Sequence, residues 1–239
     1  MKTKAVILAS GVGRRLAPLT DETPKPLIMV RGVSILDRTI RSLADNKITS
    51  IIITTGHLEK KIKEFLRNKY KEIDITYIKN PLYDKTNYIY SLWLVREAIK
   101  NNNVVLLHGD LIYDQELMRK IVKESKSCVL VKRKGKIPKK DFKARVKNGL
   151  VTEIGVNLLG CDIKFCAPMY KFLEKDFKKF MNQIGKFVKE GIVNCYAEDA
   201  LNKISTEIKL FPVYYDNEFC MEIDDFNDLE KAKMIFKNE

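Results

Sequence analysis

The sequence predicts an α/β fold of the doubly wound kind, a mainly parallel sheet with helices on both faces. Short runs rich in Val and Ile have the length of buried strands, and the segments between them carry apolar residues at helical spacing. A glycine turn ends the first of these runs. Parallel strands in such folds bind ligands at their carboxyl ends, so we expect the site residues to lie just after strands.

The size and composition of the chain predict a single soluble domain spanning residues 1–239. Of its 239 residues, 45% are apolar and 31% are charged. No apolar stretch reaches the ~20 residues that cross a bilayer, and the amino terminus lacks the apolar core of a signal peptide. We therefore expect a cytoplasmic protein with no membrane partner. Five cysteines without a C-x-x-C pair indicate reduced thiols.

The net charge of +13 favours an anionic ligand. The lysines are mixed with acidic residues in helical segments such as 59–67, and the sequence has no aromatic-basic motif of an RNA reader. We therefore expect no nucleic-acid partner. A field of this sign would still attract a small anionic substrate.

Strands and helices alternate through the first 126 residues. Apolar residues at 35, 36, 40, 43 and 44 form a helical stripe, whereas 50–55 is a mostly apolar run that ends at a glycine. The expected order is strand 5–9, helix 35–46, strand 50–55, helix 58–69, strand 73–78, helix 89–100, strand 103–108 and helix 114–124. This alternation is typical of a parallel sheet.

The pattern changes after residue 126. Asn148 and Gly149 predict a hairpin turn within 145–154. We expect strands at 127–132, 212–215 and 219–224, a helix at 168–190 that is interrupted near Gly185, and a closing helix at 227–236. There is no internal repeat or linker, so this half is expected to extend the same sheet.

A glycine loop follows the first strand. Gly11 and Gly13 let backbone N–H groups approach a ligand, which is the geometry of an anion-binding nest. Arg14 and Arg15 follow directly, and prolines on both sides stiffen the backbone of Lys25. Together these residues predict a phosphate-sized hollow surrounded by cations. The two glycines alone would equally suit an ordinary tight turn.

The whole segment from Leu8 to Leu27 is more specific than its glycines. Leu16 stands where a dinucleotide loop needs its third glycine, and no Lys-Ser/Thr pair closes the loop as in a P-loop. The string L-A-x-G-x-G-x-R-L-x-P-L-T-x-x-x-P-K-P-L closely resembles the nucleotidyltransferases of the sugar-nucleotide pyrophosphorylase superfamily. Those enzymes join a nucleoside triphosphate to a phosphorylated metabolite and release pyrophosphate. The resemblance implies a nucleotide-binding half at 1–126 and an acceptor-binding and metal-binding half at 127–239.

Two acidic residues are the predicted metal ligands. Asp110 follows a strand, and Glu222 and Asp224 lie two apart on another expected strand, so both point to one face. The resemblance gives Asp110 and Asp224 the role of holding Mg²⁺, with Glu222 as a supporting residue. Mg²⁺ typically takes one or two protein carboxylates. From the residues alone, both aspartates could instead cap helices, a role for which Asp114 and Asp225 compete.

Lys25 and Arg15 are the predicted catalytic residues. A fixed ammonium beside the α-phosphate would stabilise charge that grows in the transition state, and an arginine would bind the outer phosphates. Arg15 fits the family's R-L pair, while Arg14 is expected to bind nucleotide. The resemblance implies a non-covalent mechanism. Because an acceptor phosphate is already ionised near neutral pH, no general base is needed, and we interpret His57 and His108 as positioning or packing residues.

The segment 80–94 points to the nucleotide. Its T-N-x-x-Y-S-L run replaces the glycine-rich loop of sugar pyrophosphorylases. This run, like Met221–Asp224, resembles the bacterial CTP-dependent branch that includes phosphocholine cytidylyltransferase. The resemblance therefore implies CTP as the substrate. The expected nucleotide-binding residues are Leu8, Ala9, Ser10, Gly11, Gly13, Arg14, Gly56, Asn87 and Ser91.

The sequence predicts several possible acceptors. Tyr196, Glu198 and Asp199 could attract an amine of the acceptor, as aromatic and acidic groups do, or could form an exposed helix start. Phosphocholine, phosphoglutamine and an aminoalkyl phosphonate all suit this chemistry. We therefore predict a cytidylyltransferase that acts on a small phosphorylated metabolite and supplies surface polysaccharide decoration. The alternatives are a sugar-1-phosphate nucleotidylyltransferase that uses UTP or dTTP, and a non-catalytic nucleotide-sensing domain. Whether the chain forms a homo-oligomer stays open.

Overall fold

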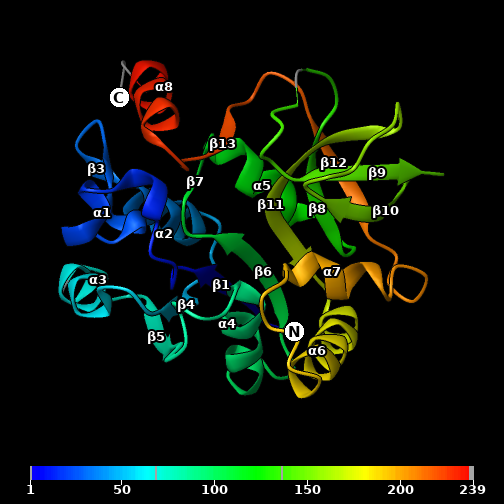
Figure 1. Ribbon diagram of the computed structural model, residues 1–239, viewed down its shortest axis with the longest axis horizontal. Helices are drawn as coiled ribbons and strands as arrows, with labels where there is room; N and C mark the ends of the chain where they lie inside the picture. The colour runs from blue at the N-terminus through cyan, green and yellow to red at the C-terminus, as the bar shows by residue number, and fades with distance from the viewer. Residues whose placement is uncertain (1, 68, 136, 237–239) are drawn as a thin grey trace.

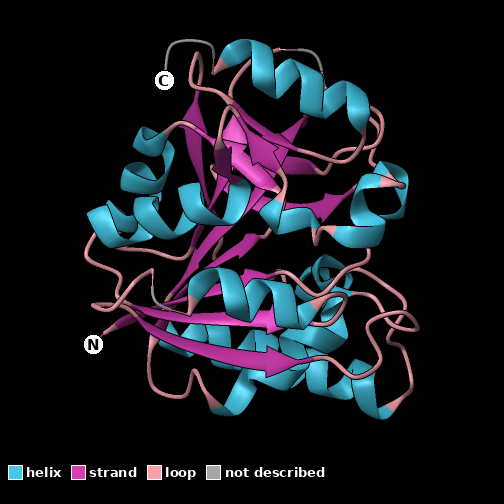
Figure 2. Cartoon of the chain, turned by 90° about the vertical axis from the view of Figure 1, so that its left-hand side faces the viewer, coloured by secondary structure: helices cyan, strands magenta, loops and turns pink. Residues whose placement is uncertain are grey.

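One nine-stranded sheet with helices on both faces dominates the fold (Figure 1, Figure 2). The computed structural model of the protein describes residues 2–67, 69–135 and 137–236. Four parallel strands form one half of the sheet in the order β5–β4–β1–β6: β1 (Thr3–Leu8), β4 (Ser50–Thr55), β5 (Asp74–Lys79) and β6 (Asn103–His108). The predicted doubly wound α/β class is confirmed.

Alternate residues of β1 face two different cores. Val6 and Leu8 belong to a cluster with α4 (Tyr88–Leu94), α6 (Glu174–Lys189) and α7 (Ala197–Asn202). Ala5 and Ile7 belong to a second cluster with α2 (Ile35–Asp45), α3 (Glu59–Leu66) and α5 (Gln115–Lys123). A strand that is buried on both faces needs apolar residues throughout, which explains the continuous apolar runs in the sequence.

The long strand β11 (Ile163–Phe172) joins the two halves of the sheet. It pairs antiparallel with β6, with β8 (Cys128–Lys132) and with β9 (Lys143–Lys147), while β12 (Phe211–Tyr215) runs parallel to β8. The predicted hairpin is confirmed as β9 with β10 (Leu150–Gly155). Its turn residues Asn148 and Gly149 have φ values of 51° and 73°, as this kind of turn requires.

The predicted helix at 168–190 is wrong over its first residues. Residues up to Phe172 belong to β11, and α6 begins only at Glu174. Most of β11 is buried on both faces, so its sequence lacks the polar alternation that would mark a strand. The interruption predicted near Gly185 is also wrong, because α6 is continuous there. Gly185 makes room for the ring of Trp93, which would lie 2.8 Å from an added Cβ.

Short elements complete the fold. They are β2 (Met29–Val30), β3 (Val33–Ser34), β7 (Leu111–Tyr113), β13 (Cys220–Glu222), α1 (Leu19–Glu22), α8 (Phe226–Ile235) and the 3₁₀ turns Arg14–Leu16, Lys25–Leu27 and Val95–Glu97. The predicted strand at 219–224 therefore ends before Asp224, and Asp225 caps α8 by accepting from Asp228 N at 3.0 Å. Within the described ranges, every helix is too short or too polar to cross a bilayer.

Candidate active site

The glycine loop follows β1, the strand at which the order of the sheet reverses. Gly13 has a φ of 73°, and its carbonyl accepts a hydrogen bond from Thr20 Oγ1 at 3.0 Å. An added Cβ at Gly11 would meet nothing within 4 Å, so this position borders open space. The loop therefore presents bare backbone to that space.

Two further glycines let the ends of β4 and β6 approach this loop. A Cβ on Gly56 would lie 2.6 Å from the carbonyl oxygen of Ser10, and a Cβ on Gly109 would lie 2.8 Å from that of Leu8. His57 N also donates to the Ser10 carbonyl at 3.2 Å. Any side chain at these two glycines would displace the backbone of the loop.

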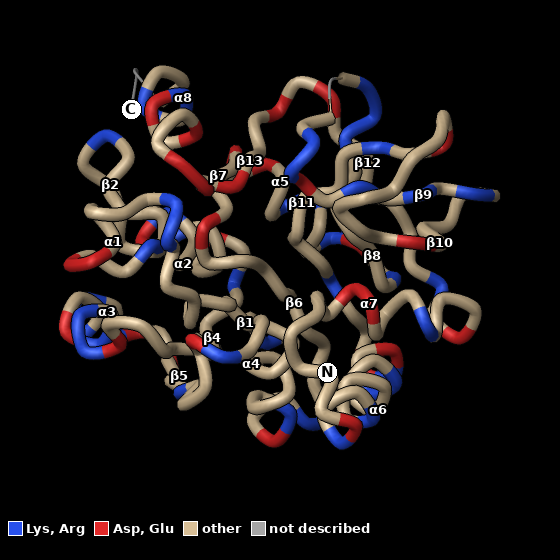
Figure 3. Tube along the Cα trace, in the orientation of Figure 1, with Lys and Arg blue, Asp and Glu red and all other residues tan. Residues whose placement is uncertain are grey.

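Lys25 lies between two carboxylates from distant parts of the chain. Its Nζ contacts Asp110 Oδ2 and lies 2.9 Å from Asp224 Oδ1. Arg15 reaches the same oxygen of Asp224 at 2.9 Å. The side chains of Lys25, Asp110 and Asp224 are 13%, 18% and 12% exposed, respectively. The structure thus brings together the predicted catalytic residues and the predicted metal ligands. Asp224 belongs to the acidic run that joins β13 to α8 (Figure 3).

The charges of this cluster stabilise one another. Burial opposes the charged form of Lys25, but the two carboxylates raise its pKa above the ordinary value. Burial also opposes the ionised form of Asp110, yet Lys25 and then His108 lower the pKa of that carboxyl. At neutral pH the cluster therefore contains an ammonium beside ionised Asp110.

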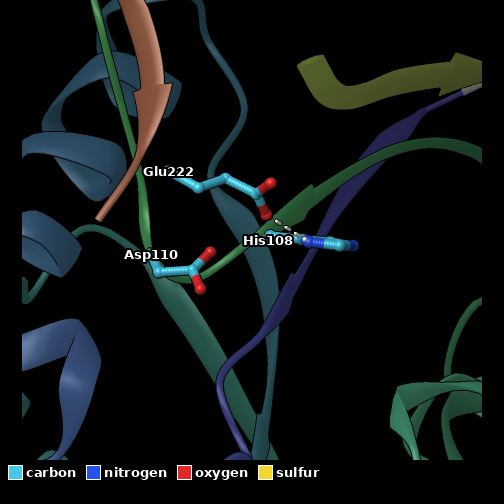
Figure 4. Close-up of side chains that lie close together, drawn as sticks. All are labelled: His108, Asp110 and Glu222. Atoms are coloured by element: carbon cyan, nitrogen blue, oxygen red, sulfur yellow. Dashed lines mark hydrogen bonds and ion pairs between the residues drawn. The ribbon is translucent and has the colours of Figure 1, made fainter. Parts of the chain in front are cut away.

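His108 and Glu222 lie near Asp110 (Figure 4). His108 Nδ1 and Glu222 Oε1 are 2.9 Å apart. Burial opposes protonation of His108, but Glu222 raises its pKa to about 9, while burial raises the pKa of Glu222 itself. One ligand atom from each of the three residues lies within 4.8 Å of the others, a spacing that suits a metal ion once His108 has lost its proton.

These residues line an open cavity of about 680 Å³, a size that suits a small-molecule ligand. The predicted residues on its wall are Leu8, Ala9, Ser10, Gly11, Gly13, Arg14, Arg15, Lys25, Asn87, Asp110, Tyr196, Glu222 and Asp224. Gly56, Ser91, Glu198 and Asp199 lie outside the wall. Wall residues that the sequence did not predict include Tyr83, Asp84, Tyr88, His108, Lys140, Phe142, Val156 and Asn194.

Ser91 lies behind the wall and holds Ser10. Their hydroxyl oxygens are 2.7 Å apart, and Asn80 Nδ2 donates to Ser91 Oγ at 2.9 Å and to Thr86 Oγ1 at 3.1 Å. Asn80 and Ser91 are each only 1% exposed. Because buried hydrogen bonds of this kind are costly to break, the network fixes the loop 80–87 against the glycine loop.

Four aromatic side chains on the cavity wall form what we call the ring box: Tyr88, His108, Phe142 and Tyr196. The ring centroids are 4.7 Å apart for Tyr88–His108 and 6.2 Å apart for His108–Phe142. They are 5.0 Å apart for Phe142–Tyr196 and 5.9 Å apart for Tyr196–Tyr88. Each ring contacts the next, and the last contacts the first. The faces of the three neutral rings attract cations, whereas His108, whose pKa of about 9 keeps it protonated at neutral pH, is itself a cation.

Glu198 and Asp199 support the ring box from outside the cavity wall. The two oxygens of Glu198 accept from the hydroxyl of Tyr88 and, at 2.7 Å, from that of Tyr170. Asp199 Oδ2 accepts from Tyr196 N at 3.0 Å at the start of α7. Of the three predicted acceptor residues, only Tyr196 lines the cavity.

Sequence reasoning missed the contribution of the segment before β9. Lys140 and Phe142 reach the wall from this segment, and no motif in the sequence marks either residue. His108 was interpreted only as a positioning or packing residue. Its place directly before Gly109 and Asp110 was the one available signal.

A glycine loop at the point of strand reversal, with a lysine and two carboxylates beside it, defines a nucleotide-binding enzyme of the α/β class. The profile of the family described as "Nucleotidyl transferase" matches residues 4–140. The chain therefore belongs to this family, and the resemblance inferred from Leu8–Leu27 is confirmed.

Curated relatives carry the names of several transferases. The bifunctional IPC transferase and DIPP synthase of Aquifex aeolicus is 32% identical over 236 residues, which cover 98% of this chain and 51% of that protein. The CTP:phosphoglutamine cytidylyltransferase of Campylobacter jejuni is 27% identical over 95% of this chain and 97% of its own length. The choline-phosphate cytidylyltransferase of Streptococcus pneumoniae is 37% identical over 43% of each chain. The chain thus spans about half of the Aquifex relative and nearly all of the Campylobacter relative.

Solved structures share the fold. The CTP:phosphocholine cytidylyltransferase from Streptococcus pneumoniae has a TM-score of 0.84 and 24% identity, and the match covers 98% of this chain and 99% of that one. The inositol-1-phosphate CTP transferase from T. maritima has a TM-score of 0.81 and 17% identity over 100% and 97% of the two chains. These likenesses place the sheet and its helices in the nucleotidyltransferase fold.

Proposed function

We propose that the protein is a CTP-dependent cytidylyltransferase that joins CMP to a small phosphorylated or phosphonylated metabolite and releases pyrophosphate. The observation that carries the proposal is the meeting of Lys25 with Asp110 and Asp224 beside the glycine loop. Both reactants are anions, so their reaction requires charge neutralisation and fixed orientation. The names of relatives support CTP and a phosphorylated or phosphonylated acceptor.

In this proposal the chain binds the triphosphate and the reaction needs no nucleophilic side chain. The backbone of Ser10–Gly13 and the guanidinium groups of Arg14 and Arg15 bind the phosphates. Lys25 donates to the oxygens on the α-phosphorus and stabilises the charge that grows there. An oxygen of the acceptor phosphate forms the new bond to this phosphorus. The bond from the α-phosphorus to the bridging oxygen breaks, and pyrophosphate leaves with the electron pair.

The site fits a Mg²⁺ ion, which we assign to Asp110 and Asp224. Asp110 Oδ1 is buried and has no hydrogen-bond partner in the described part of the chain, so it is an acceptor that a hard cation would satisfy. Glu222, paired with His108, supports Asp110 from behind in this assignment. When bound, Mg²⁺ would neutralise phosphate charge and orient the reactants.

The cytidine part of CTP is assigned to the wall between the glycine loop and the loop 80–87. Leu8, Ala9 and Gly56 shape the backbone here, and Ser91 fixes Ser10. Asn87 lines the cavity and is a further proposed contact of the nucleotide. Asn87 Oδ1 caps α4 by accepting from Tyr88 N at 2.7 Å, which leaves its Nδ2 to donate to the base or ribose.

The ring box is assigned to an ammonium group of the acceptor. A cation is attracted when it lies within ~6 Å of an aromatic centroid, and this wall offers the neutral rings of Tyr88, Phe142 and Tyr196. Tyr196 would contact the ammonium group, while Glu198 and Asp199 hold the tyrosines in place. Relatives are named for phosphoglutamine, choline phosphate and 2-aminoethylphosphonate, all of which carry a positively charged nitrogen.

A polyol phosphate is the second candidate acceptor. The Aquifex relative, which aligns with 98% of this chain, is named an IPC transferase, and the T. maritima structure is named an inositol-1-phosphate CTP transferase. A polyol would bind through hydrogen bonds to hydroxyl and carboxylate groups, and it would gain nothing from the attraction between aromatic rings and a cation.

A two-way screen tests the proposal. Pyrophosphate release is measured with CTP, UTP and dTTP, each combined with phosphocholine, phosphoglutamine, 2-aminoethylphosphonate, inositol 1-phosphate and glucose 1-phosphate. We expect turnover with CTP and an amine acceptor. Turnover confined to UTP or dTTP with glucose 1-phosphate would identify a sugar nucleotidylyltransferase instead. CTP binding without turnover on any acceptor would favour a nucleotide-sensing domain.

A further inference from the structure

Lys25 pairs with the two carboxylates that are assigned to the metal ion. Its ammonium group contacts Asp110 Oδ2 and Asp224 Oδ1, the latter at 2.9 Å. A divalent cation on Asp110 Oδ1, the oxygen that has no partner in the described residues, would share that carboxylate with Lys25, and on Asp224 it would meet the oxygen that Lys25 already contacts. The ammonium group and the metal ion therefore compete for one site.

Burial makes this competition strong. The three side chains are at most 18% exposed, so water screens their attraction only weakly. Without a cation, two buried carboxylates that share a site would repel each other. Lys25, joined by Arg15 on Asp224, thus stabilises the two aspartates and opposes the entry of another cation.

The stem of Lys25 lies along the glycine loop. An added Cβ at Gly13 would lie 3.3 Å from Lys25 Cβ and 3.4 Å from Lys25 Cδ. The loop to which we assign the phosphates is therefore beside the same side chain that now contacts the carboxylates. Rotation of the terminal bonds of Lys25 would move its ammonium group from the aspartates to a phosphate while the backbone stays in place.

We propose that Lys25 is a built-in competitor of the metal ion, which keeps the divalent-cation affinity of the free protein low until a nucleoside triphosphate draws the ammonium group away. The nucleotide part of this inference rests on the proposed function. By linkage, the nucleotide raises the affinity for the metal ion by the same factor by which the metal ion raises the affinity for the nucleotide.

Mn²⁺ binding, followed by the electron paramagnetic resonance signal of the free ion, tests the inference without a readout of activity. The wild type is compared with Lys25→Met, each with and without CTP. Without CTP we expect Lys25→Met to bind Mn²⁺ at least about tenfold more tightly, the effect of removing one close charge from a buried site. CTP should strengthen Mn²⁺ binding more in the wild type than in Lys25→Met.

Lys140→Met is the matched control. Lys140 lines the same cavity, but it pairs with Asp225 and Asp228 and not with the aspartates assigned to the metal ion. If any nearby lysine weakened cation binding through its charge alone, both variants would gain affinity equally. The inference requires a gain in Lys25→Met that clearly exceeds the gain in Lys140→Met.

Several outcomes would overturn the inference. They are equal or weaker Mn²⁺ binding by Lys25→Met, no detectable binding by this variant at millimolar Mn²⁺, and equal gains in both lysine variants. If circular dichroism shows that Lys25→Met does not fold, Lys25→Gln gives the same comparison with a polar side chain. The nucleotide-free measurement is independent of the reaction, so a protein that turns over no substrate can still show the competition.

Discussion

The two ends of the cavity differ in how the sequence builds them. At the phosphate end, the glycine loop and Lys25 come from one continuous motif, and two aspartates complete the cluster through direct ion pairs. The ring box instead takes one residue from each of four separate segments, which ring packing and the hydrogen bonds of Glu198, Asp199 and Glu222 bring together. If the phosphate end binds CTP and the ring box binds the acceptor, a substitution at one end should change the kinetic constants for that reactant. The constants for the other reactant should stay the same.

The largest expected effect is at the phosphate end. Asp110→Asn keeps the shape of the side chain but removes the charge that Lys25 contacts. We expect pyrophosphate release from CTP to fall about a thousandfold, because removing one preorganised electrostatic group costs about 10²–10³ in rate. The loss should be similar with every acceptor. Turnover within tenfold of the wild type, from a variant with an unchanged circular dichroism spectrum, would exclude Asp110 from the reaction.

A change in the ring box should act on the acceptor alone. Tyr196→Leu removes an aromatic face, and we expect kcat/KM for an amine acceptor to fall about three- to thirtyfold, as the loss of one cation–π contact predicts. The KM for CTP should not change. Tyr196→Phe is the matched control, since it keeps the ring and should keep most of the activity. An equal loss in both variants would show that the hydroxyl matters and the ring does not.

Two glycine substitutions distinguish a residue that supports the glycine loop from one that contacts the nucleotide. The Cβ of Gly56→Ala would lie 2.5 Å from Tyr83 Cβ and 2.6 Å from the Ser10 carbonyl oxygen. We expect this variant to lose about 1–3 kcal/mol of unfolding free energy, the usual cost of overpacking. Gly11→Ala has open space around its Cβ, so its Tm should match the wild type while its affinity for CTP falls. Equal Tm values for the two variants would contradict this division.

The smallest expected effect concerns Asp141, which lies between the cavity residues Lys140 and Phe142. Burial raises its pKa to about 6, with Asp224 and Asp228 adding to the rise against the opposing effect of Lys140. The folded pKa exceeds the unfolded value of about 4, so the protonated form favours folding and stability falls as the pH rises from about 4 to about 6.

Asp141→Asn should remove this fall. Between about pH 4.5 and pH 7.5, the unfolding free energy of the wild type should drop relative to that of the variant by about 1–2 kcal/mol. Urea denaturation at several pH values gives this difference directly. A difference that stays constant over the whole range would show that Asp141 titrates normally.

The sequence predicted the parts of the fold and site that depend on local order. The apolar runs of β1, β4 and β6 and the motif 8–27 are continuous, so the sheet class and the glycine loop could be recognised. β11 could not be separated from α6, because a strand buried on both faces has no polar alternation. Phe142 and Tyr88 were missed as wall residues, since their approach depends on how β9, α4 and α7 pack. The variants described above test whether the predicted residues bind the reactants to which we assign them.

The most direct test of separate phosphate and acceptor ends compares one charged acceptor with its uncharged analogue. The best amine acceptor from the screen is assayed with CTP against the isostere in which carbon replaces the ammonium nitrogen. We predict that kcat/KM for the neutral compound is lower by about tenfold or more, with the KM for CTP unchanged. Equal turnover of the two compounds, or faster turnover of inositol 1-phosphate than of either, would contradict the account.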